Sequence, residues 1–385
     1  MRVHLRKIIV GVIVLAALTA VVYRSRHKMH LADFTWRKFI HAVGQANITY
    51  LLLSILAIYA CYAIRALRWQ RFSRHLGPSG FWNTYSATIM GFAAIFILAR
   101  PGEPVRPLLL ARKNHFQVSS MFGIWVLERL FDFASAVILA CLSVLVFSGM
   151  LIDAGANSDW IDNARKGAWI LAGLLLALTA LLVYFRLHGA GELDRRLVGW
   201  RARGGWRRTA GGIIGGFSQG LQAIKTVPDL LFAIFYSAAH WGLVALIYLF
   251  VCQAFGDAFS QSDMNYPGAM LLLAVTLVGS TLQLPGIGGG AQIATLIALT
   301  QIFGVEQEPA TAIAVALWVI TFSSCILIGV PLLIHEGFSM GDLRKLAREE
   351  SKAERAGTHV PAERVPLAGE HSAKTPLKTS KDTPK

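Results

Sequence analysis

The chain has 385 residues, of which 55% are hydrophobic and 15% are charged, whereas soluble domains carry about 25% charged residues. Lysine and arginine outnumber aspartate and glutamate by 37 to 22, which gives a formal net charge of +15. This combination excludes a soluble enzyme, a disordered protein and a disulfide scaffold, and so much apolar surface argues against a nucleic-acid partner. We therefore expect a membrane protein that crosses the bilayer several times.

Residues 1–47 are predicted to form an N-terminal anchor helix followed by a loop. The apolar stretch 8–23 follows a basic beginning, and no small-residue pattern typical of signal-peptide cleavage comes after it. We expect this helix to be retained in the membrane.

Apolar stretches further along the chain predict an all-α integral membrane protein, because a helix needs about 20 apolar residues to cross a bilayer. Together with the short stretch 8–23 they give about six full spans. The other predicted spans are 48–64, 119–148, 168–185, 229–253 and 309–334. Two further apolar segments, 84–111 and 267–303, are interrupted at their centres by Pro and Gly, so simple counting gives eight hydrophobic segments.

Loop charges orient these segments, since cytoplasmic loops carry an excess of Lys and Arg. The basic loops are 65–83, 100–118 and 186–228, and the acidic ones are 149–167, 254–266 and 304–308. The basic loop 24–47 opposes the resulting orientation. With basic loops cytoplasmic, each interrupted segment enters and leaves on one face. We therefore predict two oppositely directed re-entrant helical hairpins, a pattern that points to a transporter binding site. The alternative is eight ordinary spans with kinks.

The predicted transmembrane domain covers 48–335 and includes the basic cytoplasmic loop 186–228. The segment 336–385 is rich in Lys, Glu, Pro, Ser and Thr, which predicts a disordered cytoplasmic tail. No segment outside the membrane is long enough for a catalytic domain.

Three charged residues lie inside the predicted span 119–148: Glu128, Arg129 and Asp132. A rise of 1.5 Å per residue places the two carboxylates roughly 14–20 Å from Ser119, near the bilayer centre. Their i, i+4 spacing puts both on one helix face. Charges at this depth are costly unless paired. They form either a structural ion pair between helices or a polar lining for a headgroup or ion path.

The tip of the first hairpin supplies Arg100, Glu103 and Arg106, and its prolines prevent a continuous helix. Arginine forks at membrane depth suit a phosphate, which they hold bidentately. Alternatively, these arginines neutralise Glu128 and Asp132. Both can hold in turn, with carboxylate pairing in the empty site and phosphate pairing in the loaded one.

The tip of the second hairpin is glycine-rich and precedes a short half-helix, 291–303. Its residues are Pro285, Gly286, Gly288, Gly289 and Gly290, with Gln292 following. Exposed backbone N–H groups and the positive end of a helix dipole favour an anion there. The alternative is that the glycines allow tight helix packing.

The other polar residues of the spans predict no catalytic chemistry. We interpret His240 as a packed side chain, and Arg65 and Arg68 as interfacial anchors, of which Arg65 is the one able to point inward. The four cysteines lie apart in apolar stretches, which is typical of buried small hydrophobic residues. Because no metal-ligand set and no Ser/His/Asp pattern is recognisable, we expect no cofactor, no metal and no enzyme activity.

Three blocks in order resemble the lysylphosphatidylglycerol synthase transmembrane-region family, also called flippase-like membrane proteins. Arg68-Trp69 is followed by the stretch 98–106, which is similar to the family's Pro-x-Arg-x-Gly-Glu-x-x-Arg block. Glu128-Arg129-x-x-Asp132 looks like an intramembrane Glu-Arg-x-x-Asp, and the tip 285–290 is similar to a Pro-Gly-Gly-x-Gly block.

The resemblance implies a lipid-translocating role. The synthases of the family carry a large soluble aminoacyl-transfer domain, whereas only a short tail follows Ile334 here, so we expect this chain not to make the lipid. The family often has Glu shortly after the glycine tip where this chain has Gln292, and Ala99 replaces the Pro before Arg100.

We therefore predict a bacterial inner-membrane flippase for a lipid with a phosphate-bearing headgroup, either an anionic phospholipid or a polyprenyl-phosphate lipid. The headgroup would pass between the two hairpin tips. One alternative is a membrane-embedded transferase that uses a polyprenyl-phosphate donor. Another is an auxiliary subunit that docks a separate lipid-modifying synthase through the basic segment 186–210.

Overall fold

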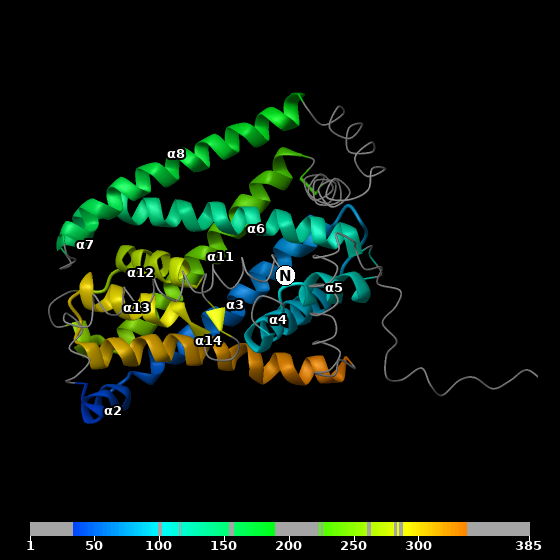
Figure 1. Ribbon diagram of the computed structural model, residues 1–385. Helices are drawn as coiled ribbons and strands as arrows, with labels where there is room; N and C mark the ends of the chain where they lie inside the picture. Colours follow the sequence, from blue (N-terminus) through cyan, green and yellow to red (C-terminus); the bar gives the residue numbers. More distant parts are fainter. Residues whose placement is uncertain are drawn as a thin grey trace, which may run out of the picture. The chain divides into compact units, whose positions relative to one another are not determined.

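The computed structural model is almost entirely helical (Figure 1). It describes residues 34–98, 102–114, 116, 118–153, 158–188, 223–224, 226–259, 263–280, 283–284 and 288–336. The predicted anchor helix 8–23, Arg100, Pro285, Gly286, most of the basic loop 186–228 and the tail from 337 lie outside these residues.

The helices follow one another in this order along the chain. They are α2 (Trp36–Gly44), α3 (Ile48–Ser73), α4 (Phe81–Leu98), α5 (Val105–Lys113), α6 (Val118–Cys141), the π-helical η3 (Leu142–Val146), α7 (Ser148–Asp153), α8 (Ser158–His188), α11 (Val227–Ala254), the 3-10 turn η4 (Gly256–Phe259), α12 (Tyr266–Gly279), α13 (Gly290–Gln301) and α14 (Gln307–His335). The strands β1 (Gln283–Leu284) and β2 (Gly288–Gly289) form one short antiparallel pair. The predicted all-α class is confirmed.

Five helices in the described part of the chain are long and apolar enough to cross a membrane. They are α3, α4, α6 continued by η3, α11 and α14. The predicted span 168–185 lies within the helix α8. α4 has 18 residues, so it is itself as long as a short span, where the sequence analysis expected one arm of a re-entrant hairpin.

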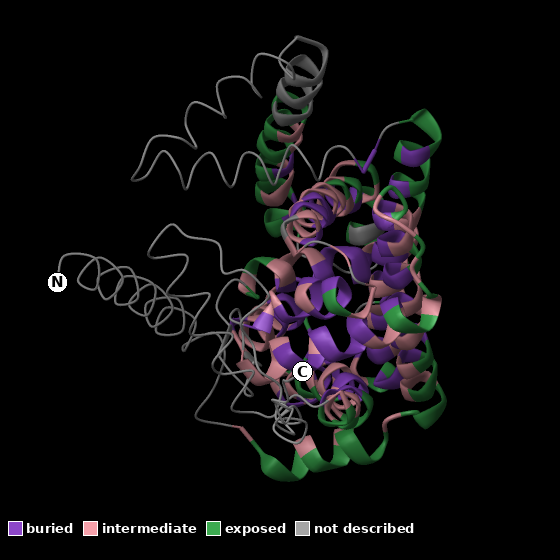
Figure 2. Ribbon diagram, turned by 90° about the vertical axis from the view of Figure 1, so that its right-hand side faces the viewer, coloured by how far each residue is buried: buried purple, intermediate pink, exposed green. Residues whose placement is uncertain are grey.

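The chain divides into two compact units. Among the described residues, unit 1 comprises 34–68, 128–188 and 230–324, and unit 2 comprises 69–127, 223–229 and 325–336. Buried residues lie where helices face one another and exposed residues lie on outward faces (Figure 2). In unit 1, one such core contains Trp241, Ala245, Met270 and Leu273.

The second predicted hairpin is present in unit 1 as α12, the β1–β2 pair and α13. Asn265 caps α12 by accepting a hydrogen bond from the backbone N–H of Gly268, 2.9 Å away. The helices pack closely, since a Cβ on Gly279 would lie 2.3 Å from the carbonyl oxygen of Gly290. The hydroxyls of Thr276 and Thr295 are hydrogen-bonded at 2.8 Å. Gly279 therefore serves close packing against Gly290 at the start of α13.

The first predicted hairpin is present in unit 2 as α4 and α5. A Cβ on Gly91 would lie 2.6 Å from Cβ of Arg106, and one on Gly102 would lie 2.3 Å from the carbonyl oxygen of Ala94. Gly102 lies in the turn before α5, and the two contacts follow opposite chain directions, so the segment from Gly102 into α5 folds back on α4. That each hairpin enters and leaves on one membrane face stays a prediction.

The segment 34–47 is not a loop throughout, because α2 occupies much of it. Within unit 1, the Lys38 ammonium lies 3.3 Å from the Glu306 carboxylate, and the Thr35 N–H donates to Glu308 at 3.1 Å. The Asn47 N–H donates to the Ala254 carbonyl at 2.8 Å. Part of the basic charge that opposed the predicted orientation is thus balanced by the acidic loop 304–308.

Candidate functional site

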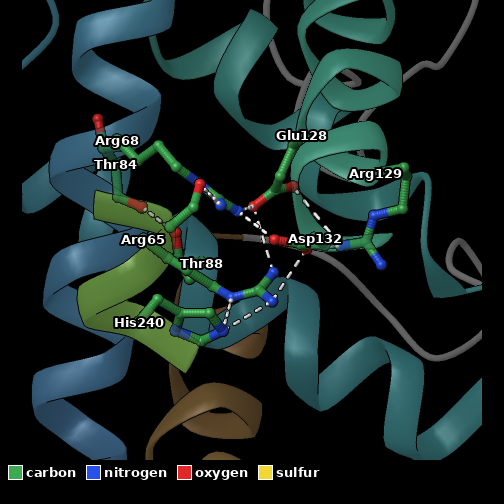
Figure 3. Close-up of polar contacts among 9 residues, drawn as sticks. Arg65, Arg68, Thr84, Thr88, Glu128, Arg129, Asp132 and His240 are labelled. Atoms are coloured by element: carbon green, nitrogen blue, oxygen red, sulfur yellow. Dashed lines mark hydrogen bonds and ion pairs between the residues drawn. The ribbon is translucent and has the colours of Figure 1, made fainter. Parts of the chain in front are cut away.

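Three helices of unit 1 bring charged side chains together in its interior (Figure 3). We call the set the arginine–carboxylate cluster. It consists of Arg65 and Arg68 from α3, Glu128 and Asp132 from α6, and His240 from α11. All five side chains are buried. Residues three or four apart share one helix face, so the local helix geometry presents each pair on α3 and α6 as a unit.

Arg68 is the most enclosed cation of the cluster, with no exposed surface. Its Nη2 lies 2.7 Å from Asp132 Oδ1 and 2.9 Å from Glu128 Oε1, and its Nη1 donates to the Ser237 hydroxyl at 2.9 Å. One guanidinium therefore joins all three helices. Such charge-assisted hydrogen bonds are about twice as strong as neutral ones.

Arg65 contacts the same two carboxylates one turn earlier on α3. Its Nη1 lies 3.2 Å from Glu128 Oε1 and its Nη2 lies 3.1 Å from Asp132 Oδ2. Each carboxylate is thus shared by two guanidinium groups. This sharing offsets the cost of burying four charges, which would be several kcal/mol per ion if the charges were unpaired.

His240 belongs to this cluster and is not simply a packed side chain. Nε and Nη2 of Arg65 lie 3.1 and 3.0 Å from His240 Nε2. A guanidinium has only donors, so Nε2 accepts and the proton of the neutral ring is on Nδ1. His240 is buried, as its interpretation as a packed side chain expected, and in addition it accepts from Arg65.

Arg129 approaches the two carboxylates from the other side in the view of Figure 3. Its Nη2 lies 3.4 Å from Asp132 Oδ2 and 3.6 Å from Glu128 Oε2, and its side chain is 39% exposed. The cluster and Arg129 together hold three guanidinium charges against two carboxylates and a neutral imidazole. Their formal sum is +1.

Two buried N–H groups of the cluster have no hydrogen-bond partner within the described part of the chain. They are Nε of Arg68 and Nδ1 of His240. Buried donors are nearly always satisfied in folded proteins. The positive surplus and these two donors make the site chemically suited to an acceptor-rich, negatively charged group.

The predicted residues of the first hairpin are found in unit 2. Arg106 is buried, with its guanidinium carbon 4.9 Å from the ring centre of Trp69 and 5.8 Å from that of Phe92. Glu103 is half-buried in the turn before α5. The arginines of this hairpin were one predicted set of partners for Glu128 and Asp132. In unit 1, the cations found on those carboxylates are Arg65, Arg68 and Arg129.

The glycine-rich tip of the second hairpin is partly closed by its own chain. The Gly289 N–H donates to Gln292 Oε1 at 2.7 Å, so one of the amides expected to attract an anion already has an acceptor. Gly289 has φ 120°, a conformation that only glycine adopts without strain. Gly290 is buried at the start of α13, and Gly288 lies in β2.

Arg68 was not among the site residues predicted from the sequence, which placed it with Arg65 as an interfacial anchor. α3 extends to Ser73, beyond the predicted span 48–64, so both arginines lie well inside the helix. The i, i+3 spacing of Arg65 and Arg68, matched to the i, i+4 spacing of Glu128 and Asp132, was the signal that could have revealed the pairing.

The comparison with known families decides what kind of protein this is. The model of the lysylphosphatidylglycerol synthase transmembrane region matches residues 8–329. The chain belongs to this family. Its membership and its long apolar helices make it a multi-pass membrane protein of a lipid-related family. A search of curated proteins found no match. The matched region includes every residue of the arginine–carboxylate cluster.

Proposed function

We propose that this protein is a flippase that moves a lipid with a phosphate-bearing headgroup between the leaflets of the bacterial inner membrane, with its C-terminus in the cytoplasm. The observation that carries the proposal is the buried arginine–carboxylate cluster, which together with the partly exposed Arg129 holds one surplus positive charge. Charges inside a membrane domain are expensive and are most often functional.

The cluster would act by exchanging acceptors. In the empty protein, Glu128 and Asp132 occupy the forks of Arg65 and Arg68. A phosphate offers the same bidentate geometry, so an incoming headgroup would replace one carboxylate on the arginine forks. Arg129, which is partly exposed and within 3.6 Å of both carboxylates, would then retain the displaced one.

The roles of the hairpin residues stay predictions from the sequence. Arg100, Glu103 and Arg106 from the first hairpin and Gly288, Gly289, Gly290 and Gln292 from the second keep the roles predicted from the sequence. Pro285 and Gly286 belong to the same predicted set. The protein would act without a cofactor and without forming or breaking a covalent bond in the lipid.

Reconstitution into vesicles tests the proposal. A fluorescent phosphatidylglycerol and a fluorescent polyprenyl-phosphate analogue are incorporated, and a membrane-impermeant reductant measures exchange between leaflets. We expect the wild-type chain to accelerate exchange of at least one anionic lipid, and Glu128→Gln and Arg65→Gln to reduce it at least tenfold. Lys38→Gln, which removes an exposed ion pair with Glu306, is the matched control and should retain full exchange.

A purely structural role for the cluster predicts a different result. Variants that remain monodisperse and melt near the wild-type temperature, yet lose exchange, support a transport site. Exchange equal in wild type, variants and empty vesicles would overturn the proposal. Product formed by the purified chain from a polyprenyl-phosphate donor would indicate a transferase instead. Loss of function confined to deletions within 186–210 would indicate an auxiliary subunit.

A further inference from the structure

The helix α2 has an apolar face that no other described residue buries. Trp36, Ile40 and Val43 follow one another at i, i+4 and i+7, which places them on one stripe. Their side chains are 69%, 65% and 48% exposed. Arg37 and His41 lie on the opposite face, and no residue of α2 is buried (Figure 2).

A helix of this size does not form alone in water. α2 has nine residues, whereas isolated helices shorter than about 12–15 residues are marginal, and most helical stability comes from covering the apolar face. The ring contacts of the segment are local, with Trp36 5.4 Å from Phe34 and 5.8 Å from Phe39 between ring centres. A partner outside the described chain must therefore cover the stripe.

The polar contacts of α2 fix its place in unit 1. Near its beginning, Lys38 forms an ion pair with Glu306, and the backbone N–H of Thr35 donates to Glu308. The two glutamates lie where the connection from α13 enters α14. The residue that follows its C-terminal turn, Asn47, is bonded to the last residue of α11. Figure 1 shows α2 beside the beginning of α14. α2 thus lies near the end of α11 and the beginning of α14.

The apolar stripe is continuous along the chain with a lipid-facing surface. α3 begins four residues after the end of α2, and its first turns expose Ile48, Leu52 and Leu56 at i, i+4 and i+8. α3 is apolar enough to cross the membrane, so this exposed row faces acyl chains. α2 therefore lies at the boundary that these side chains enter.

We propose that α2 is an interfacial helix that docks on the surface of the same membrane that α3 crosses. Its apolar stripe would lie among the outermost acyl carbons, and its basic face would meet anionic headgroups. A short helix with Trp and large apolar residues on one face and Lys or Arg on the other has the composition of such helices.

A second copy of the chain fits this surface less well. A specific protein interface buries about 800 Å² on each partner, which the exposed face of one nine-residue helix does not supply. Docking on lipid would hold the connection between α13 and α14 at the membrane surface, because Lys38 and Thr35 bind its two glutamates.

Photocrosslinking in a bilayer tests this placement. The full chain, with benzoylphenylalanine at Ile40 or at His41, is reconstituted in vesicles of phosphatidylethanolamine and phosphatidylglycerol in a 3:1 ratio and irradiated. Both positions are exposed, so neither substitution disturbs a buried contact. We expect at least fivefold more phospholipid adduct from position 40, on the apolar face, than from position 41, on the polar face.

A second pair of positions protects the test against misfolding of one variant. The same probe at Trp36 and at Arg37 should repeat the contrast between the two faces. Equal lipid adducts from the two faces, or none from either, would overturn the proposal. Crosslinks from position 40 to a second copy of the chain would also overturn it and would identify α2 as a dimer contact.

Discussion

Four arginines recur at every third position from the second half of α3 to the turn directly after it, and the two inner ones differ sharply from the two outer ones. In unit 1, Arg65 and Arg68 share two carboxylates, and their side chains are 7% and 0% exposed. In unit 2, Arg71 and Arg74 share Asp229, at 3.0 and 3.5 Å, and are 24% and 62% exposed.

The same ion-pair chemistry therefore has different consequences at the two ends of this row. Asp229 is buried, so the two ends differ in the exposure of their arginines. An ion pair with an exposed arginine contributes about 0–1 kcal/mol because water competes for that charge. A buried charge that loses its partner costs about 3–5 kcal/mol because no water replaces it. The ion pair of the exposed Arg74 can be lost at little cost in stability. The charges of the inner cluster, in contrast, must stay paired or acquire another partner. This dependence on a partner makes the inner cluster the better candidate for binding an anion.

Removing one inner arginine should produce the largest effect. Arg68→Met leaves Asp132 and Glu128 with fewer cations, so we expect a loss of about 3–5 kcal/mol in the free energy of unfolding. Chemical denaturation in detergent micelles measures this loss. The double variant Arg68→Met/Asp132→Leu removes one charge of each sign and should cost less than the sum of the two single variants. Strict additivity would show that the two side chains are not coupled.

Changing His240 should sharpen the comparison with an intermediate effect. His240→Leu removes the acceptor for Arg65 Nε and leaves a buried donor unpaired, which costs about 1–3 kcal/mol. His240→Gln keeps an acceptor oxygen and should recover most of that loss. Thermal melting of the two variants in the same detergent checks the order. Equal melting temperatures would mean that the hydrogen bond to Arg65 contributes nothing.

The outer carboxylate should matter mainly as a helix cap. Asp229 accepts from the N–H and the hydroxyl of Thr226, and its own N–H lies 3.3 Å from that hydroxyl. Asp229→Asn keeps an acceptor oxygen at the start of α11 but removes the charge facing Arg71 and Arg74. We expect a loss of about 1 kcal/mol, measured by the same denaturation series. A loss as large as that of Arg68→Met would contradict the contrast between the two ends.

The smallest effect is expected at the most exposed arginine. Arg74→Met is the same chemical change as Arg68→Met, and it should alter the free energy of unfolding by less than about 0.5 kcal/mol. Repeating the measurement at high salt should abolish the difference, because salt screens exposed pairs. A salt-independent loss would mean that Arg74 stabilises the protein through packing of its aliphatic chain.

Local sequence patterns were sufficient for much of the fold. Apolar length predicted helices over the described spans, and the Pro and Gly at the centres of 84–111 and 267–303 predicted where the chain turns back. α4–α5 and α12–α13 are those hairpins. The segment 34–47 was harder to interpret, because the nine residues of α2 are too few for hydropathy to separate an amphipathic helix from a loop.

One half of the candidate site, its two carboxylates, was predictable from the sequence. The spacing of Glu128 and Asp132 put both carboxylates on one face of a helix, and the structure has them there, sharing the same two arginines. Their partners were not predictable in the same way. Arg65 and Arg68 follow an apolar stretch, and basic residues in that position are typical of interfacial anchors.

The sequence by itself determined that this is a helical membrane protein with two interrupted segments and charged residues at depth, because hydropathy, helix periodicity and the effects of Pro and Gly are local properties. Only the tertiary structure decided which cations meet Glu128 and Asp132 and that His240 joins them. That choice depends on how α3, α6 and α11 are rotated about their own axes, and packing between helices, not spacing within one helix, sets those rotations.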